Sequence, residues 1–339
     1  MTRGSAQRAG GSAVEGYALV LLAAACWAGG GLIAKWLFTP RTPDTLTWPF
    51  PPLGVDVDPV LLSGARAMTA FAMVLLYLLL RRRDLLVVQR RQLPFLATFG
   101  VLGLACMHFA YFKTISLTGV ATAILLEYLA PVIVLAFSVV ALRERPTWTL
   151  PVAVALSVLG CALMVGALGG EGLVVSPAGL AWGLASAVLF AGYMLMGRFA
   201  APRYSPWTLL AYGLGAASIF WLLVLGGPGR VAELLSDRGA LLTVLVLALV
   251  STVIPFGFFL KALHLIDATR AAITSTAEPV IAGLAAWFVF DERLSALQLL
   301  GGALVVGAVV LSQVRTRTPA EMPVVADKVL ADNPQERVP

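Results

Sequence analysis

Two glutamates, Glu127 and Glu278, lie deep inside apolar stretches of the chain, and a proline follows each of them closely. A charged side chain in an apolar environment costs a few kcal/mol or more, so it persists where it is paired, faces water or carries a proton. Because burial disfavours the charged form of a carboxyl group, the two residues could bind and release protons. The structural alternative is a neutral glutamate that is hydrogen-bonded between helices.

Three prolines interrupt the apolar stretches: Pro131, Pro255 and Pro279. Proline has no N–H, so the carbonyl four residues earlier loses its helical partner. In lipid, interrupted helices are tolerated where they line a cavity or pack against protein. The prolines therefore indicate either a binding site or plain packing kinks. The carbonyls that they free belong to Glu127, Ser251 and Ser275.

Three more polar side chains fall within apolar stretches. The guanidinium of Arg66 is a natural fork for a carboxylate, so it could hold an amino-acid substrate; alternatively it reaches the surface or pairs with one of the glutamates. His108 is followed one turn later by Tyr111. A histidine in a span could relay protons because it titrates near neutral pH, whereas a hydrogen bond between helices is the structural alternative.

Aromatic and small residues recur at helical spacing between 178 and 197. They are Trp182, Ser186, Tyr193 and Gly197. Their spacings put them on one face of a helix. With aromatic residues from other stretches they could wall an amphipathic pocket, while ordinary packing or an interfacial belt is the alternative. The other members of this set are Trp27, Tyr128 and Tyr212.

The stretches that carry these residues are long enough to cross a membrane. The composition is 59% hydrophobic and 12% charged, with a mean hydropathy of +0.89, whereas soluble domains carry about 25% charged residues. A helix needs about 20 apolar residues to span a bilayer. The sequence therefore predicts an all-α integral membrane protein with ten transmembrane helices. They are expected at approximately 17–38, 59–80, 93–112, 118–141, 148–167, 178–197, 207–226, 240–260, 270–290 and 296–314.

The sequence contains an internal repeat. The interval from Pro131 to Glu144, in an Arg-Glu-Arg cluster, equals the interval from Pro279 to Glu292, in an Asp-Glu-Arg cluster. A repeat of this length indicates that the protein is built from two similar halves. Five helices per half is an odd number, so the second repeat is expected to be inverted relative to the first. Two inverted five-helix halves are typical of secondary transporters, whose site lies between the halves.

The repeat divides the chain into four segments. We expect a cytoplasmic tail at 1–16, the first five-helix repeat at 17–167, the second at 178–314 and a disordered cytoplasmic tail at 315–339. With the N-terminus inside, fifteen Lys and Arg residues face the cytoplasm and six face outward, which is a clear positive-inside bias. The sequence thus predicts a multi-pass protein of the cytoplasmic (inner) membrane, with both termini inside and a Pro-rich outer loop at 39–58.

Several motifs carry a family resemblance: Trp-Ala-Gly at 27–29, Ala-Pro-Val at 130–132, Glu-Pro-Val at 278–280, the charged clusters at 143–145 and 291–293, and the Gly-rich helix that follows each cluster. Over about residues 17–314 the chain resembles the EamA-type drug/metabolite transporter superfamily. The resemblance implies a ten-helix exporter of amino acids, other small metabolites or drugs. Small four-helix relatives in the superfamily use a glutamate of their first helix for cationic drugs, and the predicted first helix here has no acidic residue.

Other classes of protein are disfavoured. The basic residues lie at helix ends rather than on one face, so nucleic acid is not an expected partner. The three cysteines lack metal-ligand spacing, and the sequence contains no Walker loop, nucleophile elbow or His-Glu-x-x-His run. Neither a metal, a cofactor nor an enzymatic activity is predicted.

The sequence favours a carrier that exports a small molecule by alternating access, with amino acids or related amphipathic compounds as the leading substrate class. Its expected partners are that small molecule, the lipid bilayer and, in a coupled mechanism, protons. Proton exchange through Glu278 or Glu127 and facilitated exchange without coupling fit the residues equally well. Efflux of lipophilic cations is an alternative, and a membrane scaffold or receptor that moves nothing is a second one.

Overall fold

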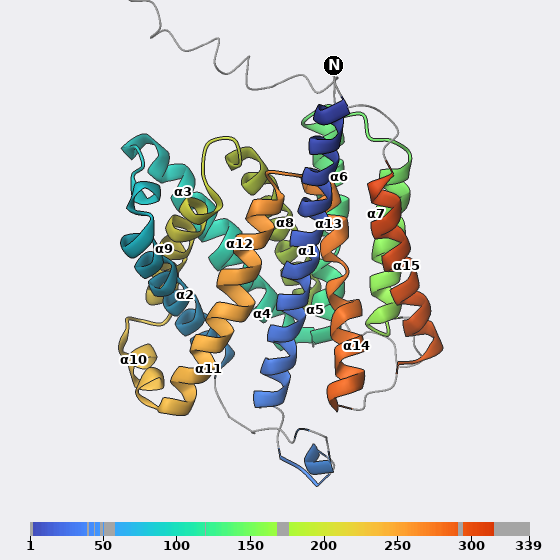
Figure 1. Cartoon of the computed structure of the whole chain (residues 1–339). Coiled ribbons are helices and arrows are strands. Elements are labelled where there is room, and N and C mark those ends of the chain that lie inside the picture. Colours follow the sequence, from blue (N-terminus) through green and yellow to red (C-terminus); the bar gives the residue numbers. More distant parts are fainter. Residues whose placement is uncertain are drawn as a thin grey trace, which may run out of the picture.

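A computed structural model of the chain describes residues 3–38, 41–43, 45–47, 50, 58–118, 120–167, 176–290 and 294–314. Within these ranges the regular secondary structure is entirely helical. The long helices lie beside one another in a bundle (Figure 1). Nine helices in the described ranges are long and apolar enough to cross a membrane, and one further apolar helix is shorter. The predicted ten-helix, all-α membrane architecture is therefore confirmed.

The first half contains five spans, of which the third includes a π turn and the fourth is broken. In chain order they are α1 (Arg3–Phe38); α2 (Pro59–Arg81); α3 (Leu93–Gly100), the π turn η4 (Val101–Cys106) and α4 (Met107–Thr118); α5 (Val120–Glu127) and α6 (Ala130–Val140); and α7 (Thr149–Met164). Short 3-10 turns lie between some of these spans, at η1 (Thr45–Thr47), η2 (Arg83–Leu86) and η3 (Arg90–Gln92).

The second half repeats this plan. Its spans are α8 (Pro177–Ala200); α9 (Pro206–Val224); α11 (Arg238–Ala248), the π turn η5 (Leu249–Val253) and α12 (Ile254–Ala262); α13 (Ala268–Ser275) and α14 (Glu278–Phe290); and α15 (Ala296–Gln313). The starts of the two π turns, Val101 and Leu249, are separated by the same offset as Pro131 and Pro279. The starts of the short helices α5 and α13 share this offset. The inverted repeat therefore extends to the irregular backbone.

Many of the spans begin at a residue whose side chain accepts a hydrogen bond from a backbone N–H in the first turn. Such a cap satisfies one of the donors that a helix leaves unpaired at its start. Proline follows the cap directly in α2, α8 and α9, where its missing N–H costs no helical bond. The capping residues are Asp58, Ser176, Ser205, Asp237, Asp267 and Ser295.

The two halves interlock through their first helices. α1 packs against α12, α13 and α14 of the second half, and α8 packs against α4, α5 and α6 of the first. Figure 1 shows α1 running between α12 and α14. The fifth helices, α7 and α15, pack against each other so closely that a Cβ atom at Gly160 would lie 2.7 Å from the carbonyl oxygen of Gly301. Each half therefore contributes side chains to the interior of the other.

Some boundaries differ from the sequence prediction. Helix α1 begins at Arg3 rather than near residue 17, so it includes the acidic residue Glu15. The short helix α10 (Gly229–Ser236), between α9 and α11, was not predicted. The expected tail at 315–339, most of the loop at 39–58 and the cluster at 291–293 lie outside the described residues.

Candidate functional site

The fourth and ninth spans are interrupted at corresponding positions. Residues 128–129 separate α5 from α6, and residues 276–277 separate α13 from α14. Pro131 and Pro279 lie just after the two interruptions, where a proline cannot donate the backbone hydrogen bond that would continue the helix. Glu127 is the last residue of α5, whereas Glu278 is the first residue of α14. The glutamates therefore lie on opposite sides of equivalent breaks.

Tyr128 connects the two breaks. Its hydroxyl oxygen lies 2.6 Å from Oε2 of Glu278 and 3.2 Å from the carbonyl oxygen of Ser275. A phenol has one proton to donate, yet here it lies within hydrogen-bonding distance of two acceptors. The side chain is almost completely buried, at 4% exposure. The break in the first half is thus tied directly to the break in the second.

Glu127, in the first half, accepts a hydrogen bond from a residue of the second half. The hydroxyl of Ser186, on α8, donates a 2.9 Å hydrogen bond to Oε1 of Glu127. In the described part of the chain neither Glu127 nor Glu278 forms an ion pair with a basic side chain. The two carboxyl groups lie close enough to interact electrostatically with each other. Two half-buried carboxyl groups are thus held by hydroxyl groups and not by cations.

Tyr111, on α4, lies between these carboxyl groups and a second polar cluster, which contains Arg66 and His108. It interacts electrostatically with both glutamates and with Arg66. Arg66 also interacts with His108, one turn before Tyr111 on α4. The sequence-predicted Arg66, His108, Tyr111, Glu127 and Glu278 are therefore brought into one connected region of the interior.

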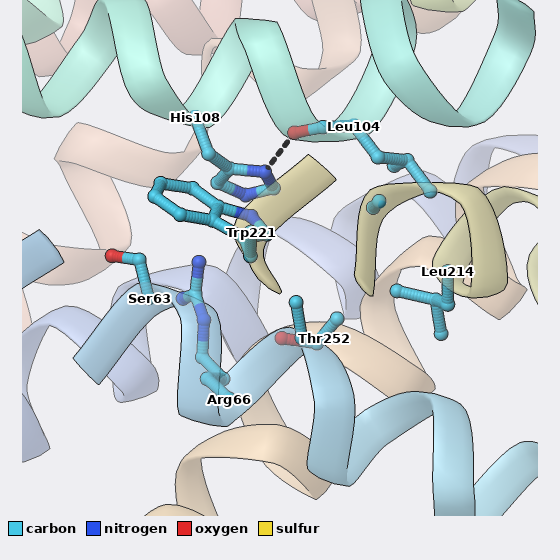
Figure 2. A pocket seen from close by; sticks show the side chains of 9 residues that line it. Ser63, Arg66, Leu104, His108, Leu214, Trp221 and Thr252 are labelled. Carbon is cyan, nitrogen blue, oxygen red and sulfur yellow. Dashed lines mark hydrogen bonds between the residues drawn. The ribbon is translucent and has the colours of Figure 1, made fainter. Parts of the chain in front are cut away.

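Arg66 and His108 line a small cavity, together with Ser63 and Thr252 as the other polar members (Figure 2). Its apolar walls come from Ala67, Leu104, Leu214, Ala217 and Trp221. The volume is about 10 Å³, which is space for about one water molecule. The cavity is therefore closed around its polar groups in this conformation.

Both halves supply this cavity, through α2 and α4 of the first and α9 of the second, and through both π turns. Leu104 belongs to η4 and Thr252 to η5, and the two residues occupy equivalent positions of the repeat. Pro255 follows η5, where it removes a helical N–H and favours the wider turn. Equivalent irregular segments of the two repeats thus meet at one place, although η4 forms without a proline.

Glycine permits two of the close approaches around the polar groups. A Cβ atom at Gly30 of α1 would lie 2.4 Å from Cβ of Ser251, and one at Gly183 of α8 would lie 2.8 Å from Cβ of Leu126. Distances below about 3 Å are not tolerated between such atoms. Gly30 lets α1 reach η5, and Gly183 lets α8 reach the residue before Glu127.

The other predicted site residues lie at varied distances from these groups. Trp27 packs between Phe190, Phe256 and Phe259. Trp182 packs against Phe109. Tyr193 is fully buried against the same three rings as Trp27, and Tyr212 donates to the carbonyl of Leu86. Neither Tyr193 nor Tyr212 lines the cavity of Arg66.

Sequence reasoning missed Ser63, Trp221 and Thr252. A weak signal for Thr252 existed, because it precedes Pro255 and matches Leu104 in the repeat. Ser63 lies three residues before Arg66, which puts both on one face of α2. Trp221 has no comparable signal, since an aromatic residue within an apolar helix is ordinary core composition.

Ion pairs join the halves at both ends of the bundle. Near the N-terminus, Lys261 Nζ lies 2.7 Å from Oε1 of Glu15. At the same end, Arg198 lies 2.6 Å from Glu144. At the opposite end Arg230, on α10, lies 3.1 Å from Asp58. In each pair one partner belongs to the first half and the other to the second.

Ten membrane-crossing helices, arranged as two inverted halves with their broken helices meeting in the interior, form the architecture of a membrane transporter. A family model agrees with this class. The EamA-like transporter family matches residues 14–166 and 177–313. The chain therefore belongs to the EamA-like transporter family, as the sequence motifs indicated.

Several named proteins are similar to this chain. An uncharacterized transporter of Archaeoglobus fulgidus is 32% identical over 62% of this chain and 75% of its own length. The threonine/homoserine exporter RhtA of Salmonella typhimurium is 27% identical over 73% of this chain and 81% of its own length. The pseudopaline exporter CntI of Pseudomonas aeruginosa is 28% identical over 71% and 81%, respectively.

The fold also resembles a solved structure, titled only as a crystal structure of a protein. The match has a TM-score of 0.69 at 21% sequence identity and covers 90% of this chain and 96% of the other. At this identity the likeness concerns the fold alone. The chain is thus a multi-pass transporter, and its substrate has to be argued from its own residues.

Proposed function

We propose that this transporter exports amino acids or related amphipathic metabolites by alternating access, and that proton exchange at Glu278 and Glu127 drives it. The substrate class is supported by two relatives named as exporters, one of threonine and homoserine and one of pseudopaline. The drive is supported by the hydrogen bonds around Tyr128. The protein lies in the inner membrane with both termini in the cytoplasm, in line with the distribution of Lys and Arg.

The geometry at Tyr128 carries this proposal. One phenolic proton cannot serve both Glu278 and the carbonyl of Ser275 well, at 2.6 Å and 3.2 Å. A proton on Glu278 resolves the competition, because the carboxylic acid then donates to the tyrosine oxygen while the tyrosine donates to the carbonyl. When that proton leaves, the tyrosine turns to the carboxylate and releases the carbonyl of Ser275. Protonation of Glu278 therefore changes a bond between the two broken helices.

Alternating access requires that the halves close in turn at each end. The pairs Glu15–Lys261 and Glu144–Arg198 hold one end together, and Asp58–Arg230 holds a contact at the other. Glu144–Arg198 is partly buried, whereas the other two pairs are exposed. Exposed pairs contribute about 0–1 kcal/mol each, so these two can form and break as the carrier changes state. Glu127, Tyr128 and Glu278 remain in the interior while the ion pairs at the two ends form and break in turn.

The first test measures transport in proteoliposomes with a panel of twenty radiolabelled amino acids and an imposed pH gradient. At least one amino acid should be exchanged for protons by the wild-type protein. Glu278→Gln should retain folding but lose the stimulation by the gradient, because an amide cannot take up a proton. Glu233→Gln, the same change on the exposed side of α10, is the matched control. Proton-driven transport by Glu278→Gln at the wild-type rate would refute the coupling.

Efflux of lipophilic cations is a second candidate, favoured by two carboxyl groups that no cation of the described chain neutralises. In that case ethidium would be expelled from the vesicles and no amino acid would be exchanged. Arg66→Ala would then be harmless, since a cationic substrate gains nothing from a guanidinium. A substrate with a carboxylate would suffer from the same change.

A further inference from the structure

The cavity at Arg66 has an unbalanced charge. Arginine is effectively always protonated, and in the described part of the chain no carboxylate lies within ion-pair distance of Arg66. Its contacts are a long 3.4 Å hydrogen bond from Nη1 to the hydroxyl of Ser251 and the ring of Phe112, 6.0 Å from the guanidinium carbon. A guanidinium has five N–H donors. Most of them therefore have no acceptor among the residues that the structure describes.

His108 does not balance this charge. Its Nδ1 lies 2.6 Å from the carbonyl oxygen of Leu104, which can only accept, so Nδ1 carries the proton. The ring adds no negative charge, whether it is neutral or cationic. Figure 2 shows Arg66 extending toward the same space as the ring of His108. The cavity therefore has at least one positive charge and favours an anion.

Thr252 provides a second, independent observation. Its side chain is 3% exposed, it lines the cavity, and its hydroxyl has no hydrogen-bond partner among the described residues. Two other buried threonines, Thr114 and Thr274, donate to the carbonyl four residues earlier, at 2.8 Å and 2.7 Å. Thr252 makes no such bond in the described part of the chain. Figure 2 places Thr252 beside Arg66.

An unpaired hydroxyl in a protein interior costs about 1–3 kcal/mol, so a donor at this position favours an acceptor that the described residues do not provide. The same acceptor can satisfy the guanidinium. A planar carboxylate matches the fork of arginine with two oxygens and leaves lone pairs for a hydroxyl. The walls of Leu104, Leu214 and Trp221 suit the apolar part of an amphipathic molecule.

We propose that Arg66 and Thr252 bind the carboxylate of the transported compound, at the meeting point of the two π turns. The carrier then takes molecules with a free carboxylate and leaves their amides and simple amines. The cavity of about 10 Å³ is too small for a whole metabolite, so the group enters when the halves move apart. This assignment rests on the proposed export of amphipathic metabolites, and it adds the group by which they are recognised.

The experiment measures binding and not flux. The thermal unfolding of the purified, full-length protein is followed with each of twenty amino acids and, in parallel, with the amide of each, because a ligand of the folded form raises Tm with its occupancy. At least one acid should raise Tm while its amide does not. If no acid stabilises the wild-type protein more than its amide, the carboxylate subsite is refuted.

Four variants then assign the site. Arg66→Gln should weaken binding of the stabilising acid on the order of a hundredfold, and Arg66→Lys should recover part of it, since the charge remains without the fork. Thr252→Val should weaken binding about tenfold, whereas Thr252→Ser should bind as the wild type does. Arg82→Gln removes an exposed guanidinium and serves as the matched control.

Thr252→Val also distinguishes a binding role from a structural one. Removing an unpaired buried hydroxyl should leave the Tm of the ligand-free protein unchanged or raise it, while binding falls. A lower ligand-free Tm with unchanged binding would contradict the proposal. This variant also covers the case in which Arg66→Gln does not fold.

The two proposals fail in different ways. Loss of gradient-driven flux in Glu278→Gln, together with unchanged binding in Arg66→Gln, would refute the subsite and leave the proposed function. Binding that depends on Arg66 in a protein that transports no amino acid would refute the function and leave the subsite.

Discussion

The two halves of this transporter share one backbone plan and differ in the side chains that they place on it. Both third spans contain a π turn, at η4 and η5, and both fourth spans break between two short helices. The breaks even begin after helices of the same length, Val120–Glu127 and Ala268–Ser275. A symmetric backbone is what two interchangeable conformations require, because each half can then adopt the shape of the other.

Three ionisable side chains of the interior, His108, Glu127 and Glu278, do not follow this symmetry. The repeat equivalents of His108 and Glu127 in the second half are Phe256 and Ser275, so both groups are replaced there. The equivalent of Glu278 in the first half is Ala130. The backbone plan is thus duplicated, whereas these three side chains each occur in one half only. We infer that the repeated backbone elements move during transport and that the unrepeated ionisable side chains determine what is carried.

The largest effect is expected when a second carboxyl group is introduced at the repeat equivalent of Glu127. Ser275→Glu would place a carboxyl group at the equivalent of Glu127, at a position that is 0% exposed and one turn from Glu278. Burial without a cationic partner should destabilise the protein by about 3 kcal/mol or more. Thermal unfolding of the purified protein measures this loss. Ser275→Ala, which loses one local hydrogen bond to Ala272, should cost about 1 kcal/mol; equal stability of the two variants would contradict this account.

A smaller effect is expected where the two breaks touch. Tyr128→Phe removes the hydroxyl that lies between Glu278 and the carbonyl of Ser275. Gradient-driven transport should fall about tenfold, corresponding to one charge-assisted hydrogen bond, while the protein stays folded. The repeat offers a matched control, because the equivalent residue Thr276 donates only to Ile273 in its own turn.

Thr276→Ala should therefore transport nearly as the wild type does. The readout is the rate of proton-driven uptake at two imposed pH gradients. If both variants lose the same activity, the breaks contribute through their local structure and the bridge between them has no special role.

Much of the frame could be predicted from the sequence. Ten apolar stretches and a repeated Pro-to-Glu spacing indicated the ten-helix architecture, which the structure confirms, because lipid leaves a chain few ways to satisfy its backbone. The π turn η4 could not be predicted, since no proline or other local signal marks it. The extension of α1 to Arg3 was missed for a related reason: a polar segment can continue a helix that a hydrophobic span has already nucleated.

The polar interior was predictable only in part. Glu127, Glu278 and Arg66 are rare charged residues within apolar stretches, and such residues stand out in any sequence of this class. Their partners were predicted less well: Ser186 and Tyr128 were expected to line a pocket but not to bind the carboxyl groups, and Thr252 was not predicted. The pairing of a hydroxyl on α8 with a carboxyl group on α5 depends on how two halves of the chain dock, and no local pattern contains that information.

The smallest effect is expected for a carboxylate outside the spans. It tests whether the pH dependence of transport requires a carboxyl group at the broken helices or arises from any carboxyl group of the protein. A hydrogen bond from Arg82 lowers the pKa of Asp84 below its ordinary value, which is about 4. The stability that this pair contributes is present above that ordinary value and is lost only as the pH falls through the lowered pKa. The pair is fully exposed, and such pairs contribute little. Asp84→Asn should therefore leave the dependence of transport on pH between about 5.5 and 8 unchanged, whereas Glu278→Gln should flatten it. A change of the same size in both variants would show that the pH dependence belongs to the surface of the protein and not to the broken helices.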